Sequence, residues 1–310
     1  MKKNLRMRSA RIVRMRRWWR SIGVPSQLTI IGLVLAGLGL VPAYLALFDN
    51  GGPESSSATA PPGVTNSSVL QPGGQAAPLR LDGTYNRTRE SLMWAVPRTL
   101  PAEDDAVILT PNLIGNDPAQ NEISALLLKR DGVKIEADET EDFRPHSQVR
   151  LVVTGQHERP VLITGLRANV VQRKRPLSQT LVYGPPQGAG ENIQVGLDLD
   201  ARTPSARNFR AGRFLADPYF AAHHVSVKAG EQVVFMIRAF TRKCYCEWEL
   251  LVDAVIDGKD QVFKVKDGDR PFRTTAFAAT YKTIYNFDFF EGRFVKLPPG
   301  SKFPPPESGP

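Results

Sequence analysis

The chain has 310 residues and a formal net charge of +9 at pH 7, and its positive excess lies at the N-terminus. Residues 1–20 contain nine Lys and Arg residues and no acid, which leaves 31 basic against 31 acidic residues in the remainder. A neutral main domain lacks the general electrostatic footprint of a nucleic-acid-binding protein. We therefore expect no nucleic-acid partner for it.

An uncharged apolar segment, Leu28–Phe48, follows the basic residues. At about 1.5 Å of rise per residue it would reach roughly 32 Å as a helix, enough to cross a membrane. Cations precede this segment and none follows it until Arg80, so the sequence predicts a single-pass protein of the cell membrane. Residues 1–27 form its cytoplasmic tail, and residues 49–310 are extracytoplasmic. A cleaved signal peptide is the alternative, and the length of the apolar run favours a retained anchor.

The tail carries a pattern typical of a basic amphipathic helix on an anionic leaflet. Arg16, Arg17, Trp18, Trp19 and Arg20 are the residues that we expect at the inner membrane surface. The alternative is an unstructured tail that only enforces topology.

Small residues form a stripe along one side of the predicted membrane helix. Gly32, Ala36, Gly39 and Ala43 recur at helical spacing, which would let a second helix approach closely. Small residues are common in membrane helices, so a chance pattern in lipid contact is the favoured interpretation, and self-association through this stripe is the alternative.

Composition divides the remainder of the chain. Residues 49–83 are rich in Gly, Pro, Ser and Ala and are predicted to be a flexible stalk. A β-rich extracytoplasmic domain is expected over residues 84–297. Residues 298–310 are rich in proline and are predicted to be a disordered tail.

The first part of the domain gives mixed signals. Arg89–Val96 is expected to form a short helix or turn, and Ala106–Thr110 a strand. Ile123–Leu128 is also read as a strand, which an Asp-Gly turn would join to Val133–Ala137 as a hairpin. A helix over Asn121–Arg130 is the alternative. Whether this part belongs to the sandwich or forms a separate subdomain stays open.

From about residue 147 the strand signals become regular. Many short strands with turn punctuation and little helical periodicity predict an antiparallel β-sandwich that is Ig-like in general architecture. The run Val225–Val233 resembles the strand, tight turn and strand of Ig-like sandwiches. The expected strands are Gln148–Thr154, Val161–Gln172, Leu177–Tyr183, Asn192–Leu199, His224–Val227, Gln232–Phe240, Cys244–Ile256, Gln261–Val265 and Tyr281–Phe290.

Alternation predicts which side chains of two strands face the core. The two sets are Ile193, Val195, Leu197 and Leu199, and Val233, Phe235, Ile237 and Ala239.

The two cysteines of the chain, Cys244 and Cys246, are separated by one residue. In an extended strand both cysteines would share a buried face with Trp248. Their two Cα atoms would then lie about 6.6 Å apart, which is near the upper limit for a disulfide. A disulfide would need a bulge or turn at Tyr245. Buried free thiols and a redox or metal function are the alternatives.

Other polar clusters are interpreted as structural. His223 and His224 are adjacent and should point to opposite faces of a strand, which suits rim histidines better than metal ligands. The acidic run 136–142 is expected to be a solvated connector. Asp198-Leu199-Asp200 would suit a glycosyltransferase, because the tail, anchor and stalk also resemble the layout of Golgi-type members of that class. The strand pattern favours a polar strand face.

Aromatic side chains alternate near the C-terminus. Tyr281, Tyr285, Phe287 and Phe289 should share one face of the last strand. A core strand is expected, with an exposed stacking platform for sugars or a partner as the alternative.

No catalytic, cofactor-binding or metal-binding residue emerges from these patterns. The sequence favours a non-enzymatic, membrane-anchored protein that binds an extracytoplasmic protein or glycan, or that stabilises an envelope assembly. An exported membrane-bound enzyme of glycosyltransferase-like layout and a single-pass sensor are the alternatives.

Overall fold

The structure is a computed structural model that describes residues 77–85, 91–137, 145–184, 194–210 and 213–303. The described residues are mainly β and form three sheets, in agreement with the predicted β-sandwich. None of their helices has the length and apolar character needed to cross a bilayer. The predicted span Leu28–Phe48 lies outside the described residues.

The first sheet has the strand order β1-β4-β11-β7-β8-β9. Its pairs are antiparallel except β11 and β7, which run parallel. The purely antiparallel sandwich expected from the sequence was therefore wrong at this pair. The strands are β1 (Leu79–Tyr85), β4 (His146–Gly155), β7 (Gln194–Asp198), β8 (Arg207–Arg210), β9 (Arg213–Pro218) and β11 (Gln232–Phe240).

The second sheet has the order β10-β5-β12-β13, and β14 pairs with the first half of β12. All its pairs are antiparallel. A short helix, α6 (Tyr219–Ala222), precedes β10. The strands are β5 (Val161–Lys174), β10 (Val225–Val227), β12 (Tyr245–Ile256), β13 (Lys259–Val265) and β14 (Phe272–Thr275).

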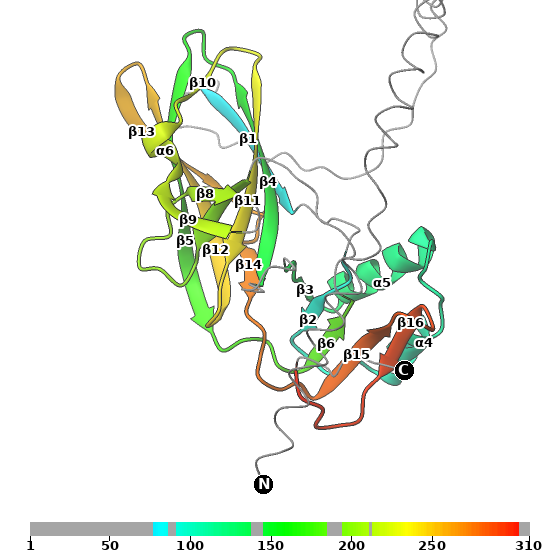
Figure 1. Cartoon of the computed structure of the whole chain (residues 1–310). Helices are drawn as coiled ribbons and strands as arrows, with labels where there is room; N and C mark the ends of the chain where they lie inside the picture. Colours follow the sequence, from blue (N-terminus) through cyan, green and yellow to red (C-terminus); the bar gives the residue numbers. More distant parts are fainter. Residues whose placement is uncertain (1–76, 86–90, 138–144, 185–193, 211–212, 304–310) are drawn as a thin grey trace, which may run out of the picture. The chain divides into compact units, whose positions relative to one another are not determined.

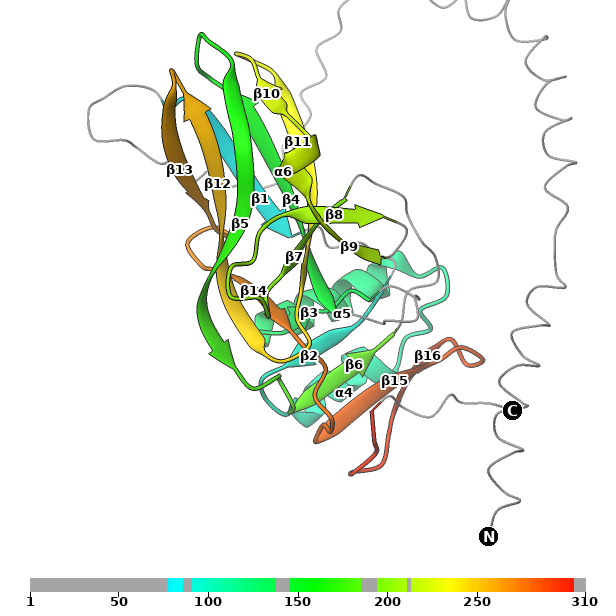
Figure 2. The same ribbon diagram turned by 60° about the vertical axis from the view of Figure 1, so that its left-hand side comes forward.

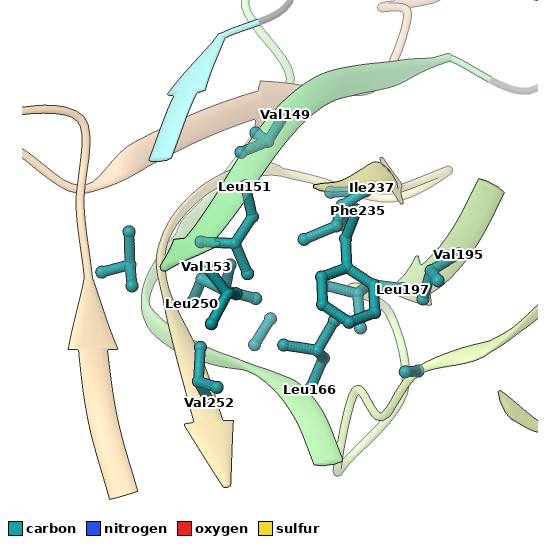
Figure 3. Packing of buried hydrophobic residues seen from close by; sticks show 14 of the residues in the cluster. Val149, Leu151, Val153, Leu166, Val195, Leu197, Phe235, Ile237, Leu250 and Val252 are labelled. Atoms are coloured by element: carbon teal, nitrogen blue, oxygen red, sulfur yellow. The ribbon is translucent and has the colours of Figure 1, made fainter. Parts of the chain in front are cut away.

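These two sheets lie face to face and share one apolar core (Figure 2). Alternate side chains of β4, β7 and β11 meet those of β5 and β12 between the layers (Figure 3). Of the eight side chains predicted to face the core, six are buried there: Val195, Leu197, Leu199, Phe235, Ile237 and Ala239. Val233 is partly buried against the same core, and Ile193 lies outside the described residues. Each fully buried aliphatic side chain contributes about 1.5–3 kcal/mol, so this core is the main source of stability in the sandwich.

The third sheet has the order β16-β15-β6-β2-β3 and carries two helices (Figure 1). We call these elements, with the segments that pack on them, the α/β module. Its strands and helices are β2 (Trp94–Val96), α4 (Ala102–Leu109), α5 (Asp117–Lys129), β3 (Val133–Lys134), β6 (Thr180–Tyr183), β15 (Thr283–Asp288) and β16 (Arg293–Lys296).

Each face of the third sheet has its own cover. Trp94, Val182 and Tyr285 pack on one face with the apolar sides of α4 and α5. On the other face, Leu181 and Ile284 pack with Tyr281, in the segment between β14 and β15, and with Phe303. The sheet is therefore buried on both sides although it is small.

Helices α4 and α5 correct two predictions. Ala106–Thr110 was expected to be a strand and lies in and just after α4, and the strand expected at Ile123–Leu128 lies in α5. The alternative helix over Asn121–Arg130 was the better interpretation. Ala119, Ile123 and Leu127, at the i, i+4, i+8 spacing of one helical face, are the buried residues of α5.

The Asp-Gly sequence ends this helix instead of turning a hairpin. Asp131 has a positive φ of 61°, and the amide of Gly132 donates to the carbonyl of Leu127 at 2.8 Å. An αL residue with such a bond is a common helix C-terminus. A tight hairpin turn and a helix C-terminus both use Asp-Gly, and the local sequence alone does not distinguish the two.

Smaller differences appear at the ends of the domain. Leu79–Gly83, assigned to the stalk by composition, lie in β1, and Trp94–Val96, expected as helix or turn, form β2. Phe303, within the predicted tail, packs on Phe277 with ring centroids 4.5 Å apart. Residues 304–310 lie outside the described residues.

Candidate functional site

Cys244 and Cys246 form a disulfide at the start of β12, with a Cα separation of 5.6 Å. Both are buried, and Trp248 lies further along the same inward face of the strand. The indole nitrogen of Trp248 donates to the hydroxyl of Thr274 on β14 at 3.0 Å. The disulfide thus belongs to the wall of the sandwich core.

Tyr245, between the two cysteines, points to the opposite face. Its hydroxyl donates to the carboxylate of Glu247 at 2.9 Å. Burial, together with the neighbouring carboxylate, raises the pKa of Tyr245 to about 12, so the phenol stays protonated.

The turn from β11 to β12 is stabilised by Asp200. One carboxylate oxygen accepts from the hydroxyl of Thr241 at 2.8 Å, and the other accepts from the amide of Arg242 at 2.7 Å. The hydroxyl of Thr241 in turn accepts from the amide of Cys244 at 3.2 Å. Asp198 accepts from the amide of Asp200 at 3.0 Å. The Asp-x-Asp sequence therefore braces a turn.

Three chain segments meet at this end of the sandwich. β5 ends opposite the start of β12, where Lys174 pairs with Tyr245. β7 ends beside the end of β11, where Asp198 pairs with Phe240. The guanidinium of Arg173 donates to the carbonyl of Leu199 at 3.0 Å, and this contact joins the end of β5 to the loop after β7.

Exposed cations gather on these three segments, and we call this set the basic end. It comprises Arg173, Lys174, Arg175, Arg202, Arg242 and Lys243. The acids of the same segments are Asp198 and Asp200, whose carboxylates accept the hydrogen bonds described above. The basic end is a local positive surface on a domain that is neutral as a whole.

This arrangement suits binding of anions. Arginine and lysine at the tips of turns reach outward and pair with phosphate or carboxylate groups. The turn that carries Arg242 and Lys243 is held by the disulfide on one side and by Asp200 on the other. Such bracing lowers the conformational entropy lost on binding.

The histidines do not join the cysteines. His223 and His224 are both exposed, whereas opposite faces were expected. The ring of His223 stacks on Tyr219 with centroids 4.2 Å apart, and its Nδ1 lies 2.7 Å from the carbonyl oxygen of Tyr219. In the part of the chain that the structure describes, no three His, Cys, Asp or Glu side chains are grouped to hold a metal ion.

The acidic run is described only at its start. Glu136 accepts from the hydroxyl of Ser91 at 2.7 Å and pairs with Lys134 at 3.1 Å. Asp138, Glu139, Glu141 and Asp142 lie outside the described residues.

The aromatic run near the C-terminus is divided between core and surface. Tyr281 and Tyr285 are buried, and burial raises the pKa of Tyr281 to about 12. Phe289 and Phe290 are 46% and 75% exposed beyond the end of β15. The core interpretation thus holds for the tyrosines, but the shared face expected for them was wrong. Tyr281 precedes β15 and packs with Leu181 and Ile284 on one face of the third sheet, whereas Tyr285 packs with the helices on the other face. Phe289 and Phe290 lie at the surface.

The remaining predicted site residues belong to the tail and to the predicted membrane helix. The five tail residues Arg16 to Arg20 and the small-residue stripe Gly32, Ala36, Gly39 and Ala43 lie outside the described residues.

The sequence left the pairing of Cys244 and Cys246 open and singled out Asp198-Leu199-Asp200 separately, and it did not reveal the basic end that the disulfide and Asp200 support. The cations of the basic end come from separate segments that strand pairing brings together. The net charge of the domain does not reveal them, because its basic and acidic residues balance. The runs Arg173-Lys174-Arg175 and Arg242-Lys243 are visible as local signals, but nothing local shows that they lie together.

Comparison with known proteins identifies no family. No family model matches the chain, and a search of curated proteins finds no significant match.

Proposed function

We propose that this is a non-enzymatic, membrane-anchored protein whose extracytoplasmic domain, an Ig-like sandwich in general architecture, binds an anionic polymer of the cell envelope. The basic end is the surface that makes the contact. One observation carries this proposal: six exposed cations from three segments lie at the same end of the sandwich. The turn that bears two of them is held by the disulfide and by the hydrogen bonds of Asp200.

Membrane anchoring is the second part of the proposal, and it depends on the charge pattern of the sequence. The nine cations before Leu28 and the uncharged run to Phe48 support a cytoplasmic N-terminus and a single span. The disulfide agrees with an oxidising compartment outside the cytoplasm.

Polymer binding can be tested by neutralising part of the basic end. Lys174→Gln, Arg175→Gln and Lys243→Gln leave Arg173 and its hydrogen bond to Leu199 in place. With about 1 kcal/mol for each cation near a strongly anionic surface, the triple variant should bind on the order of 100-fold more weakly at low salt. High salt should abolish the difference.

The matched control removes three exposed lysines elsewhere, by Lys228→Gln, Lys259→Gln and Lys282→Gln. It has the same net charge as the test variant. Full-length protein would be reconstituted in vesicles with its C-terminus outward, so that the basic tail is enclosed. The probe is long-chain polyphosphate, measured by fluorescence anisotropy. Equal weakening in both variants, or no binding by the unmodified protein, would disprove the proposal.

A further inference from the structure

Three exposed apolar side chains gather at one corner of the α/β module, and we call them the apolar tip. Ile114 is 67% exposed, and Phe289 and Phe290 are 46% and 75% exposed. The tip thus holds half of the large hydrophobic side chains that are exposed among the described residues. Single exposed apolar residues are ordinary on protein surfaces, whereas a contiguous group marks a binding surface.

The tip is held in a defined conformation. The carboxylate of Asp288 accepts from the amides of Phe290 and Glu291 at 2.9 and 3.1 Å, which fixes the turn between β15 and β16. Within the turn, Gly292 has a φ of 67°, and its amide donates to the carbonyl of Asp288 at 2.8 Å.

The loop between α4 and α5 is fastened to this turn. The amide of Leu113 donates to the carbonyl of Gly292 at 2.7 Å. Ile114 lies so close over Gly292 that an added Cβ would come within 2.8 Å of its Cδ1. Glycine is therefore required at this position both for its φ and for the approach of Ile114.

An aromatic series connects the tip to the core of the module. The rings of Phe289 and Phe287 lie edge to face at 5.0 Å, and Phe287 contacts the buried Phe294 at 5.6 Å. Phe289 is thus packed, through Phe287, against the aromatic core of the module, and Phe290 follows it in the turn.

The charges around the tip indicate the kind of partner. Glu291 pairs with Arg293 at 2.6 Å, and Asp288 is occupied within the turn. Asp117 opens the helix that follows Ile114. The surroundings are neutral to slightly acidic, so the tip does not suit an anionic surface.

The length of chain before the domain limits its distance from the membrane. The predicted span ends at Phe48, and β1 begins at Leu79. Even a fully extended connection of that length reaches only roughly 100 Å, which keeps the domain at high local concentration near the bilayer. Weak apolar insertion is sufficient under such a tether.

We infer that the apolar tip inserts into the interfacial zone of a zwitterionic lipid bilayer. Aromatic and aliphatic side chains favour this zone, and the tip would fix the orientation of the tethered domain. The inference rests on the membrane anchoring in the proposed function and is independent of the basic end.

The test uses full-length protein in phosphatidylcholine vesicles that contain brominated lipid, which quenches tryptophan fluorescence on contact. Phe290→Trp places a reporter at the tip. Val262→Trp is the control, because Val262 is 57% exposed on β13. In the wild-type protein, quenching of Trp18 and Trp19 reports anchoring. Trp94 and Trp248 are buried in the domain, so brominated lipid should not quench them.

The tip inference predicts that the emission added by Phe290→Trp is quenched and blue-shifted, whereas that added by Val262→Trp is not. Quenching of the wild-type protein with no quenching at position 290 would overturn the tip inference and leave anchoring intact. Absence of quenching in the wild-type protein would overturn both. A third outcome is that iodide does not quench the fluorescence of the tryptophan at position 290 and brominated lipid does not quench it either. If iodide quenching then increases when the protein is diluted in the membrane, the tip binds a second copy of the protein, and the lipid inference is wrong.

Discussion

Asp105 shows how a single side chain in this domain can stabilise contacts between residues that are far apart in the sequence. It lies in the first turn of α4 and accepts hydrogen bonds from Tyr285 on β15 and, at 2.7 Å, from Lys296 on β16. Burial acts to raise the pKa of Asp105, but the hydrogen bonds from Lys296 and Tyr285 and the charge of Lys296 outweigh it and lower the pKa. The ammonium of Lys296 also lies 5.4 Å from the centre of the Tyr285 ring.

A pH-dependent contribution to stability follows from this pair. A carboxyl whose pKa is lower in the folded state stabilises the fold above its unfolded value, here 3.8, and loses that effect as the pH falls through the folded pKa. Asp105→Asn should lower the free energy of unfolding by about 1 kcal/mol near neutral pH. The difference from wild type should shrink as the pH falls below 3.8.

Urea denaturation at a series of pH values measures this difference. Asp269→Asn, at an exposed position in the turn after β13, is the control and should change stability little at any pH. A constant cost of Asp105→Asn from about pH 7 to about pH 2 would show that the ionised carboxylate is not the source of the stabilisation.

At the scale of elements, β1 shows how packing overrides composition. It follows a segment rich in Gly, Pro and Ser, yet it pairs with β4 along its whole length, from Leu79 opposite Gly155 to Tyr85 opposite Val149. Gly83 passes close to β13 and β14, because an added Cβ would meet a methyl of Val265 at 2.5 Å and the ring of Phe272 at 3.3 Å. β1 is therefore part of the sandwich wall.

Leu79 is 3% exposed at the start of this strand. Leu79→Ala should destabilise the domain by roughly 3 kcal/mol, because it removes buried methyl groups and leaves a cavity. Thr84→Ala, at an exposed position of the same strand, should cost less than about 1 kcal/mol. Chemical denaturation followed by circular dichroism compares the two variants, and equal costs would mean that β1 contributes nothing through its buried face.

At the scale of the whole domain, the sandwich and the α/β module are interleaved along the chain. β1 belongs to the sandwich, and β2, α4, α5 and β3 belong to the module. β4 and β5 belong to the sandwich again, β6 to the module, and β7–β14 to the sandwich, before β15 and β16 return to the module. Ser147 and Tyr85 donate to the carbonyl of Arg273 at 2.8 and 3.1 Å, and the guanidinium of Arg273 donates to the carbonyl of Asp131 at 3.3 Å.

This interleaving predicts one cooperative unfolding transition. Trp94 is buried in the core of the module and Trp248 in the core of the sandwich. Two variants that each retain one of these tryptophans should each give a fluorescence midpoint that coincides with the circular dichroism midpoint of the same protein. A fluorescence transition that precedes the circular dichroism transition in only one variant would show that its core unfolds separately.

Most of the sandwich could be predicted from local sequence. Strands buried on one face alternate apolar and polar residues, and β11 was placed from that alternation at its observed bounds. The α/β module could not be predicted in the same way. Its helices are short, and the segment Ile123–Leu128 is continuous enough in apolar character to fit a strand or a helix. Its sheet combines strands from distant parts of the chain.

What the sequence determined by itself is the local content of the domain: period-2 strands, the pair of closely spaced cysteines, and a balanced charge after a basic tail. These are properties of neighbouring residues, and neighbours suffice to reveal them. The pairing of the strands, including the parallel neighbours β7 and β11, is a property of the tertiary structure. This pairing brings Arg173, Arg202 and Arg242 to the same end of the sandwich. Tertiary structure also decided that Ile114 meets Gly292. Those contacts join residues far apart in sequence, and they form because the buried faces of the sheets can pack in only a few ways.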